Sequence, residues 1–253
     1  MDKNRNLLVR IAYVGTFYHG FQVQKNALTV QEVFQNALRK SIGVLPDIKG
    51  CSRTDTGVHA REYGISFYTG SNIGTERLVE ALNFHLPTDI RVMSVTEMSS
   101  DFHARYSATG KRYCYFVWND CVMDPFHEGR ALHFVKKIDE AELHRTAQQF
   151  VGTHDFTPFS GSKRNEGNTV RTVFSYDVDR KGKFVVFSVE ADGFLYNMVR
   201  VMVGSLLSVA RGKLTANDIR KIFESGIRPN ECFTAPASGL YLDRVFYNPE
   251  DFR

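Results

Sequence analysis

The chain of 253 residues is long enough to form one large domain or two medium ones around a sizeable buried core. A formal net charge of +4 permits a nucleic-acid partner without requiring one, and the composition is that of an ordinary globular protein. The N-terminus lacks the apolar stretch of a signal peptide, and no window of the sequence is apolar enough to cross a membrane. We therefore expect a cytoplasmic protein.

The cysteines of the chain are scattered, with no C-x-x-C pair: Cys51, Cys114, Cys121 and Cys232. A structural zinc site needs clustered ligands, so we expect no metal. The residues around the cysteines are apolar or strand-like, which predicts small buried thiols in a reducing compartment.

The first half of the chain is predicted to mix strands and helices without strict alternation. Strands are expected at 7–13, 48–51, 65–69 and 91–96, and a helix at 75–84. Another helix opens at Thr29, where Glu32 stands at the capping-box position. Apolar residues then recur at helical spacing, and Gly43 is well placed to end this helix.

The second half has a similar order of elements. Strands are expected at 112–118 and 241–246, with a hairpin formed by 172–179 and 184–190 through a turn at 180–183. Helices are expected at 139–150, 195–210 and 215–225. Capping boxes mark two of the helix starts, with Glu142 following Asp139 and Asp218 following Thr215.

Hairpins and the irregular order of elements favour an α+β fold with largely antiparallel sheets. The two halves are predicted to join near residues 104–111. We place one α+β half at 1–104, carrying the loop described next, and a second half at 105–253.

The segment 53–60, with the sequence RTDTGVHA, places a carboxylate in a turn after a predicted strand. Asp55 is followed by Gly57, whose backbone freedom allows a tightly shaped loop. Arg53 could bind phosphate, and Asp55 could act as a nucleophile or a base. An ordinary Asx-turn has the same residue pattern, so this segment alone leaves both interpretations open.

Further blocks along the chain make the interpretation specific. They are, in order, 13–24 (YVGTFYHGFQVQ), 53–60, 101–108 (DFHARYSA), 111–115 (KRYCY), 194–200 (FLYNMVR) and 239–242 (GLYL). In this order the blocks closely resemble the TruA family of tRNA pseudouridine synthases, from about residue 7 to residue 247. Several blocks in the correct order are far more specific than any one of them.

The departures from the family pattern are small. Cys51-Ser52 stands where the family often has Ala-Gly, Thr56 where Ala is common, and Phe21 where Trp is frequent. These changes affect the local packing of the loop and leave its arginine, aspartate and glycine in place.

The resemblance implies an isomerase that converts uridine to pseudouridine at positions 38, 39 and 40 of the tRNA anticodon stem-loop, without a cofactor. Asp55 would be its nucleophile. Arg53 would either help to extrude the target base or orient Asp55 through a salt bridge. Tyr113 would stack on the uracil, Arg200 would pair with Asp55, and Leu240 would form an apolar wall beneath the base.

The family also implies a pseudouridine synthase fold, in which two similar α/β-sandwich-like halves form a central cleft, and a homodimer that binds one tRNA across both subunits. Histidines occur in family-like blocks at His59, His103 and His154, and we assign them structural roles in place of acid–base roles. Basic side chains expected to contact RNA are Arg61, Arg105, Lys111, Arg112, Lys163, Arg164 and Arg171.

Two other hypotheses compete with the isomerase. The first is a non-catalytic RNA-binding module that kept the cleft, against which the intact Arg53, Asp55 and Tyr113 argue. The second is an acid–base hydrolase with a carboxylate pair such as Asp55 and Glu62, which nothing beyond proximity in sequence supports.

Overall fold

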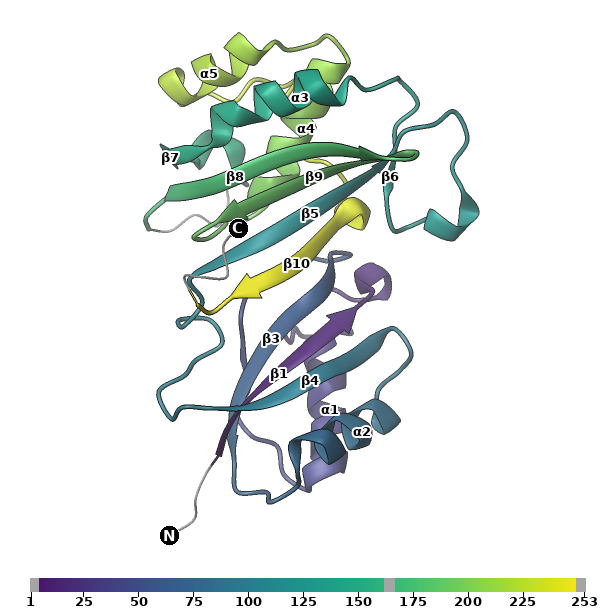
Figure 1. Cartoon of the computed structure of the whole chain (residues 1–253), viewed down its shortest axis with the longest axis vertical. Helices are drawn as coiled ribbons and strands as arrows, with labels where there is room; N and C mark the ends of the chain where they lie inside the picture. The colour runs from purple at the N-terminus through teal and green to yellow at the C-terminus, as the bar shows by residue number, and fades with distance from the viewer. Residues whose placement is uncertain (1–4, 162–166, 249–253) are drawn as a thin grey trace. The chain divides into compact units, whose positions relative to one another are not determined.

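The computed structural model describes residues 5–161 and 167–248, which form two compact units (Figure 1). The first unit holds the described residues up to Thr109 together with 242–248, and the second runs from Gly110 to Tyr241. The division expected from sequence was 1–104 and 105–253. The last strand groups with the first unit because the Thr109 amide donates to the Phe246 carbonyl at 2.9 Å, and the Tyr247 hydroxyl donates to the Ala104 carbonyl at 3.1 Å.

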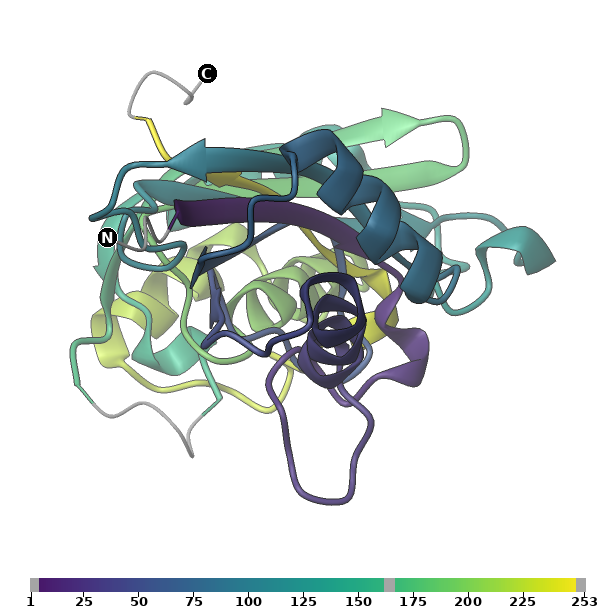
Figure 2. The same ribbon diagram turned by 90° about the horizontal axis from the view of Figure 1, so that it is seen from below.

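The sheet of the first unit has the strand order β4-β1-β3-β10. Its strands are β1 (Arg5–Tyr13), β2 (Lys49–Gly50), β3 (His59–Thr69), β4 (Ile90–Met98) and β10 (Leu240–Phe246), the last of which begins in the second unit. β1 pairs antiparallel with both β3 and β4, and β1 and β4 run side by side in both views (Figures 1 and 2). The short β2 pairs antiparallel with β3.

Two helices pack on this sheet, α1 (Val30–Ile42) and α2 (Thr75–His85). The caps of α1 are at the predicted residues: Thr29 Oγ1 accepts from the Glu32 amide at 3.3 Å, and Gly43 ends the helix in the left-handed conformation. Within the described residues, the Glu32 side chain does not return a bond to Thr29, so the predicted capping box is only half formed. α2 is fastened to β4 by a reciprocal pair of bonds, because the Asn83 amide group both donates to and accepts from the backbone of Val92.

The sheet of the second unit has the order β5-β9-β8-β7, with β6 paired in parallel to β5. Its strands are β5 (Gly110–Trp118), β6 (Leu132–His133), β7 (Gly152–Asp155), β8 (Val170–Lys181) and β9 (Phe184–Ala191). All its other pairings are antiparallel among the described residues, as the sequence predicts. β8 and β9 form the expected hairpin, in which Lys181 pairs with Phe184 across a two-residue turn.

Three helices lie together beside β8 in Figure 1: α3 (Glu140–Ala147), α4 (Met198–Ala210) and α5 (Ala216–Ser225). α4 is buried on nearly all sides, which explains why its sequence is apolar almost throughout. Single-turn 3-10 helices complete the chain at Gly15–Phe17, Pro125–His127, Gln148–Phe150, Thr157–Phe159 and Ala237–Gly239. Among the described residues, no helix combines the length and the apolar character needed to cross a membrane.

Three expectations need correction. The strand expected at 65–69 begins at His59, because Ala60 already pairs with Tyr13 beyond an irregularity in β1. The helix expected from residue 195 begins only at Met198, because Asn197 before it has a φ of 59° and cannot continue a right-handed helix. Cys121 is exposed in the loop after β5, so the prediction of buried thiols is confirmed for the other three cysteines and wrong for this one.

The capping box of α5 gives a test of the fold. The Thr215 hydroxyl accepts from the Asp218 amide at 3.3 Å, while the Asp218 carboxylate accepts from the Thr215 amide at 2.9 Å. We expect Thr215→Ala to lower the free energy of unfolding by about 1 kcal/mol, since one helix donor loses its acceptor. Thr215→Ser keeps the hydroxyl and should stay near wild type in urea denaturation. Equal midpoints for the two variants would contradict the capping role.

Candidate active site

The loop that carries Asp55 connects β2 to β3 and is fixed by its own buried residues. Asp55 is partly exposed, whereas Thr54 before it and Val58 after it are buried. The Val58 amide donates to the Asp55 carbonyl at 3.1 Å, and Gly57 between them has a φ of 77°. The turn therefore needs glycine at this position, and it presents the Asp55 side chain from a backbone that cannot shift freely.

The segment that follows β1 holds this loop from the other side. The Phe21 amide donates to the Thr54 carbonyl at 3.3 Å, and the Gly57 amide donates to the Tyr18 carbonyl at 3.2 Å. The Tyr13 hydroxyl shares a hydrogen bond of 2.8 Å with Thr54 Oγ1. The backbone on both sides of the Asp55 residue is thus tied to residues 13–21.

Two glycines bring these segments into direct backbone contact. A Cβ atom on Gly15 would lie 1.9 Å from the Val58 carbonyl oxygen, and one on Gly20 would lie 2.4 Å from the Thr54 carbonyl oxygen. Gly20 also has a φ of 81°, which favours glycine independently. The blocks at 13–24 and 53–60, separate in sequence, are therefore two parts of one structure.

Two further hydrogen bonds hold residues 13–21 in place, one to His59 and one to Asp89. The Gly15 amide donates to Nδ1 of His59, whose side chain is fully buried, at 3.0 Å. Nδ1 is thus an acceptor, which supports the structural role expected for this histidine. The Tyr18 hydroxyl donates to Asp89 Oδ1 at 2.9 Å; burial first, and then this carboxylate, raises the pKa of Tyr18 well above its usual value. Tyr18 is accordingly a neutral hydrogen-bond donor.

The departures from the family pattern are absorbed by packing. The Phe21 ring stacks on the Tyr63 ring with centroids 4.2 Å apart, and the Tyr63 hydroxyl donates to the Ser52 carbonyl. Cys51 is fully buried, with its amide donating to the Gly64 carbonyl at 2.9 Å. Phe21 and Cys51 are therefore accommodated by packing beneath the loop, while Thr56 is exposed to solvent.

Arg53 is exposed at the start of the loop. Across residues 5–161 and 167–248, no hydrogen bond or ion pair engages its guanidinium group, so it does not form a salt bridge with Asp55 in this structure. Of the two roles that the sequence leaves open for Arg53, this arrangement favours contact with a substrate over the orientation of Asp55.

The other three predicted site residues belong to the second unit. Tyr113 lies on β5, is largely buried, and meets the Phe194 ring edge-to-face at a centroid distance of 5.0 Å. Leu240 is buried at the start of β10. Next to it, a Cβ atom on Gly239 would lie 2.6 Å from the Tyr115 ring, so this segment packs closely on β5.

Arg200, in the first turn of α4, is held at two points. Its Nε donates to the Ala235 carbonyl at 2.7 Å, and its Nη1 donates to Asn197 Oδ1 at 2.8 Å. The Ala235 amide donates back to the Arg200 carbonyl at 3.0 Å. Asn197 thus positions Arg200, a role that the sequence patterns do not predict; the available signal is an asparagine directly before a helix, where this residue tolerates a positive φ.

The segment at 235–240 connects Arg200 with β5. The Tyr115 hydroxyl donates to the Pro236 carbonyl at 2.8 Å, one residue beyond the carbonyl that accepts from Arg200. Burial raises the pKa of Tyr115, and the positive charge of Arg200 offsets this rise only in part. In the second unit, the predicted residues Arg200 and Leu240 are therefore joined to the strand of Tyr113 through one short segment.

The predicted RNA contacts differ in how far they are already engaged. Arg112 is ion-paired with the buried Glu190, to which its Nε donates at 2.6 Å, so this arginine has a structural role. Arg61 is exposed and donates to Asp243 Oδ1 at 3.2 Å. Arg171 donates to two backbone carbonyls, those of Asn168 and Val170.

The remaining candidates are Arg105, Lys111, Lys163 and Arg164. Arg105 is exposed and lies 5.7 Å from the centre of the Tyr106 ring, while Lys111 is half-buried on β5. Lys163 and Arg164 lie outside the described residues. Arg105 is therefore the member of this group whose described surroundings best fit a contact with RNA.

The two other predicted histidines also have structural partners. His103 Nδ1 accepts from the Arg105 amide at 3.1 Å, and His154 Nε2 donates to the Val151 carbonyl at 3.0 Å. Glu62, the partner that a hydrolase would need, accepts from Arg10 Nε at 3.2 Å. Among the described residues, no group of three or more His, Cys, Asp or Glu side chains could hold a metal ion.

The bond between Tyr13 and Thr54 gives a test of how the loop is held. We expect Thr54→Val to lower the free energy of unfolding by about 1–3 kcal/mol, because a buried hydroxyl loses its partner while the side-chain volume is kept. Thr54→Ser retains the hydroxyl and should cost less. Urea denaturation of both variants measures the difference, and a Thr54→Val variant as stable as Thr54→Ser would contradict this role.

Comparison with known proteins places the chain in a family. A family profile described as tRNA pseudouridine synthase matches residues 10–107 and 146–248. The tRNA pseudouridine synthase A of Acetivibrio thermocellus is 44% identical over 243 residues, which cover 96% of this chain and 100% of that protein. The protein of the same name from Staphylococcus aureus strain Newman is 40% identical over 245 residues, covering 97% of this chain and 92% of its own length.

Among solved structures, a chain in the crystal structure of a Cbf5-Nop10-Gar1 complex is 11% identical with a TM-score of 0.38, over 78% of this chain and 43% of that one. This likeness is too weak to support an argument. The sequence matches, in contrast, span nearly the whole chain at high identity. The chain therefore belongs to the TruA family of tRNA pseudouridine synthases, which are isomerases.

Proposed function

We propose that this protein converts uridine to pseudouridine at positions 38, 39 and 40 of the tRNA anticodon stem-loop, with Asp55 as its nucleophile. The observation that carries the proposal is the anchored loop of the first unit. Thr54 and Gly57, on either side of Asp55, are bonded to residues 13–21, while Asp55 itself stays partly exposed. A carboxylate that is fixed in position and open to a substrate is suited to nucleophilic attack.

The reaction rearranges one nucleotide without any external group. The bond between the ribose C1′ and the base N1 breaks, the base turns, and C1′ bonds to C5 instead, while C5 gives up its proton and N1 gains one. Asp55 splits this rearrangement into easier steps by forming a covalent adduct, at either C6 of the base or C1′ of the sugar. No oxidation or reduction occurs, so the chemistry requires no cofactor.

The other site residues would bind the target nucleotide. Arg53, exposed and unpaired within the described residues, is proposed to help extrude the base from the stem. Tyr113 is proposed to stack on the uracil, and Leu240 to supply an apolar wall. Arg200 is proposed to bind in the pocket, and its bonds to Asn197 and Ala235 would hold its guanidinium in place for this role.

The family resemblance also implies a homodimer, with one tRNA reaching across both subunits. This stays a prediction of the proposal. Multi-angle light scattering of the purified protein, alone and with tRNA, measures the mass of each species directly. A protein that is monomeric under both conditions would exclude the dimer.

Replacement of Asp55 tests the proposal directly. We expect Asp55→Ala to lower the rate of pseudouridine formation by roughly 10⁴-fold or more, because the nucleophile is lost. Its affinity for tRNA should change little, since a nucleophile contributes mainly to the transition state. Unmodified tRNA transcript is incubated with each protein, and pseudouridine is mapped by carbodiimide labelling. Glu62→Gln, which alters the neighbouring carboxylate, is the matched control and should stay active.

The outcomes of this experiment separate the hypotheses. If the wild-type protein leaves the anticodon arm unmodified but binds tRNA, the chain is an RNA-binding module. If Asp55→Ala keeps full activity, the assignment of the nucleophile is wrong. If both the Asp55→Ala and the Glu62→Gln proteins lose activity with intact folding, a carboxylate pair becomes the better explanation.

The role of Arg53 has its own test. We expect Arg53→Ala to slow the reaction on a target uridine that is base-paired in the stem far more than on one placed opposite a mismatch. A mismatched base already leaves the stack at lower cost, so it depends less on an extruding side chain. The ratio of kcat/KM for the two stem-loops measures this dependence. Equal losses on both substrates would show that Arg53 acts on the chemistry instead.

A further inference from the structure

The second unit carries a group of four exposed cations, which we call the basic surface: Lys136, Lys137, Arg211 and Lys213. None of them forms an ion pair with a carboxylate in the described part of the chain. The first two lie on the loop between β6 and α3, and the other two follow the end of α4.

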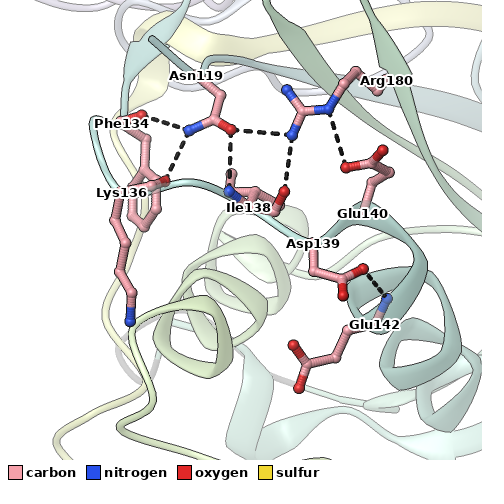
Figure 3. Close-up of polar contacts among 8 residues, drawn as sticks. All are labelled: Asn119, Phe134, Lys136, Ile138, Asp139, Glu140, Glu142 and Arg180. Carbon is pink, nitrogen blue, oxygen red and sulfur yellow. Dashed lines mark hydrogen bonds and ion pairs between the residues drawn. The ribbon is translucent and has the colours of Figure 1, made fainter. Parts of the chain in front are cut away.

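The loop that bears the two lysines is held by one side chain, that of Asn119 at the end of β5. Its Nδ2 donates to the carbonyls of Phe134 and Lys136, at 2.7 and 2.8 Å. Its Oδ1 accepts from the Ile138 amide and from Arg180 Nη2, both at 3.1 Å (Figure 3). The amide group thus uses its two donors and both lone pairs of its acceptor, and the loop has a fixed shape.

Arg180 closes the far side of this network and neutralises the carboxylate nearest to it. It donates to the Ile138 carbonyl at 2.9 Å and to Glu140 Oε2 at 3.0 Å. One oxygen of Asp139 caps α3 by accepting from the Glu142 amide at 2.9 Å. In Figure 3 the Lys136 side chain points away from the network that Asn119 and Arg180 form. The loop is therefore anchored by its backbone, and its lysine ammonium groups take no part in holding it.

Arg211 brings the second pair of cations to the same loop. Its guanidinium carbon lies 5.1 Å from the centre of the Phe134 ring and 5.2 Å from that of Phe233. The position at the end of α4 is favourable for a cation because of the helix dipole. Contact with two rings also restricts the guanidinium before any ligand arrives, so less entropy is lost when it binds a phosphate.

Some other exposed cations of the second unit are matched by carboxylates, whereas Arg130, Arg145 and Lys181 form no ion pair within the described residues. Lys183 Nζ lies 2.8 Å from Asp120, Arg220 Nε lies 3.6 Å from Glu224, and Lys221 Nζ lies 3.7 Å from Asp218. Lys136, Lys137 and Arg211 share one loop region without ion-pair partners, and Lys213 follows Arg211 by two residues, so this region has a positive potential that a polyanion would neutralise. The basic surface differs from Arg130, Arg145 and Lys181 in that a loop with a fixed backbone carries two of its cations and two aromatic rings hold a third.

We propose that the basic surface binds phosphate groups of the tRNA backbone, as a contact additional to the residues that handle the target nucleotide. The inference rests on the proposed function, because that function makes tRNA the polyanion the protein must hold. Contacts of this kind position the RNA without reading its sequence, and they weaken as the salt concentration rises.

The test compares two double variants that each remove two positive charges from the second unit. The first, Lys136→Gln with Lys137→Gln, alters the basic surface. The matched control, Arg220→Gln with Lys221→Gln, alters cations that already have carboxylate partners. Binding of each full-length protein to an unmodified tRNA transcript is measured by filter binding between 50 and 200 mM salt.

We expect the first double variant to bind roughly tenfold more weakly at 50 mM salt and to flatten the slope of log affinity against log salt by about 1–2, as the loss of one or two phosphate contacts predicts. The control should keep the wild-type slope. Arg211→Lys, which keeps the charge but loses the planar group between two rings, should weaken binding without flattening the slope. If the first variant behaves like the control, the basic surface does not bind RNA.

The binding assay involves no chemistry, so it separates this inference from the proposed function. A basic-surface variant with weakened tRNA binding, beside a wild-type protein that forms no pseudouridine, would keep the surface and overturn the activity. If instead the wild-type protein is active and the variant has the same KM and the same tRNA affinity, the proposed activity stands and the basic surface is not an RNA contact.

Discussion

The direct backbone contact between residues 13–21 and the Asp55 loop is the constraint on which the candidate site depends. Gly15 and Gly20 have no side chain where the carbonyls of Val58 and Thr54 approach, and these approaches leave no space for even one methyl group. Hydrogen bonds from Phe21 and Gly57 then fix the two segments in register. This contact fixes the position of the Asp55 carboxylate, because the Asp55 backbone lies between Thr54 and Gly57, the two residues that are hydrogen-bonded to residues 13–21.

In the second unit, a predicted site residue is positioned by side-chain hydrogen bonds instead of by close backbone contact. The guanidinium of Arg200 is positioned by hydrogen bonds to the Ala235 carbonyl and to the side-chain amide of Asn197. Neither of these two partners carries a charge. Arg112, in contrast, is ion-paired with the buried Glu190, which neutralises much of its charge.

Much of this arrangement follows from local sequence. The caps at Thr29, Asp139 and Thr215 predict three helix starts because each depends on hydrogen bonds within one turn. The family blocks identify the residues of the Asp55 loop for the same reason, since they lie close together in the chain. Local patterns are therefore a good guide in most places where the partners are neighbours in sequence.

The failures occur where the partners are distant. The first residues of β3 have no strand pattern of their own and are extended because β1 lies beside them. Asn197 is an exception, because its effect is local: its φ of 59° delays the start of α4, and its partner Arg200 is only three residues away, yet the apolar spacing around it does not reveal either feature. The four bonds of Asn119 join β5 to a loop and to β8, and nothing in the sequence around residue 119 indicates them.

The return of the last strand to the first unit has a consequence for the order in which the protein is made. β10 and Tyr247 close the unit that contains the Asp55 loop, through bonds to Thr109 and Ala104. A ribosome delivers these residues only after all of the second unit. The first unit, whose synthesis begins earlier, therefore gains its full set of native contacts only after the second unit has been made.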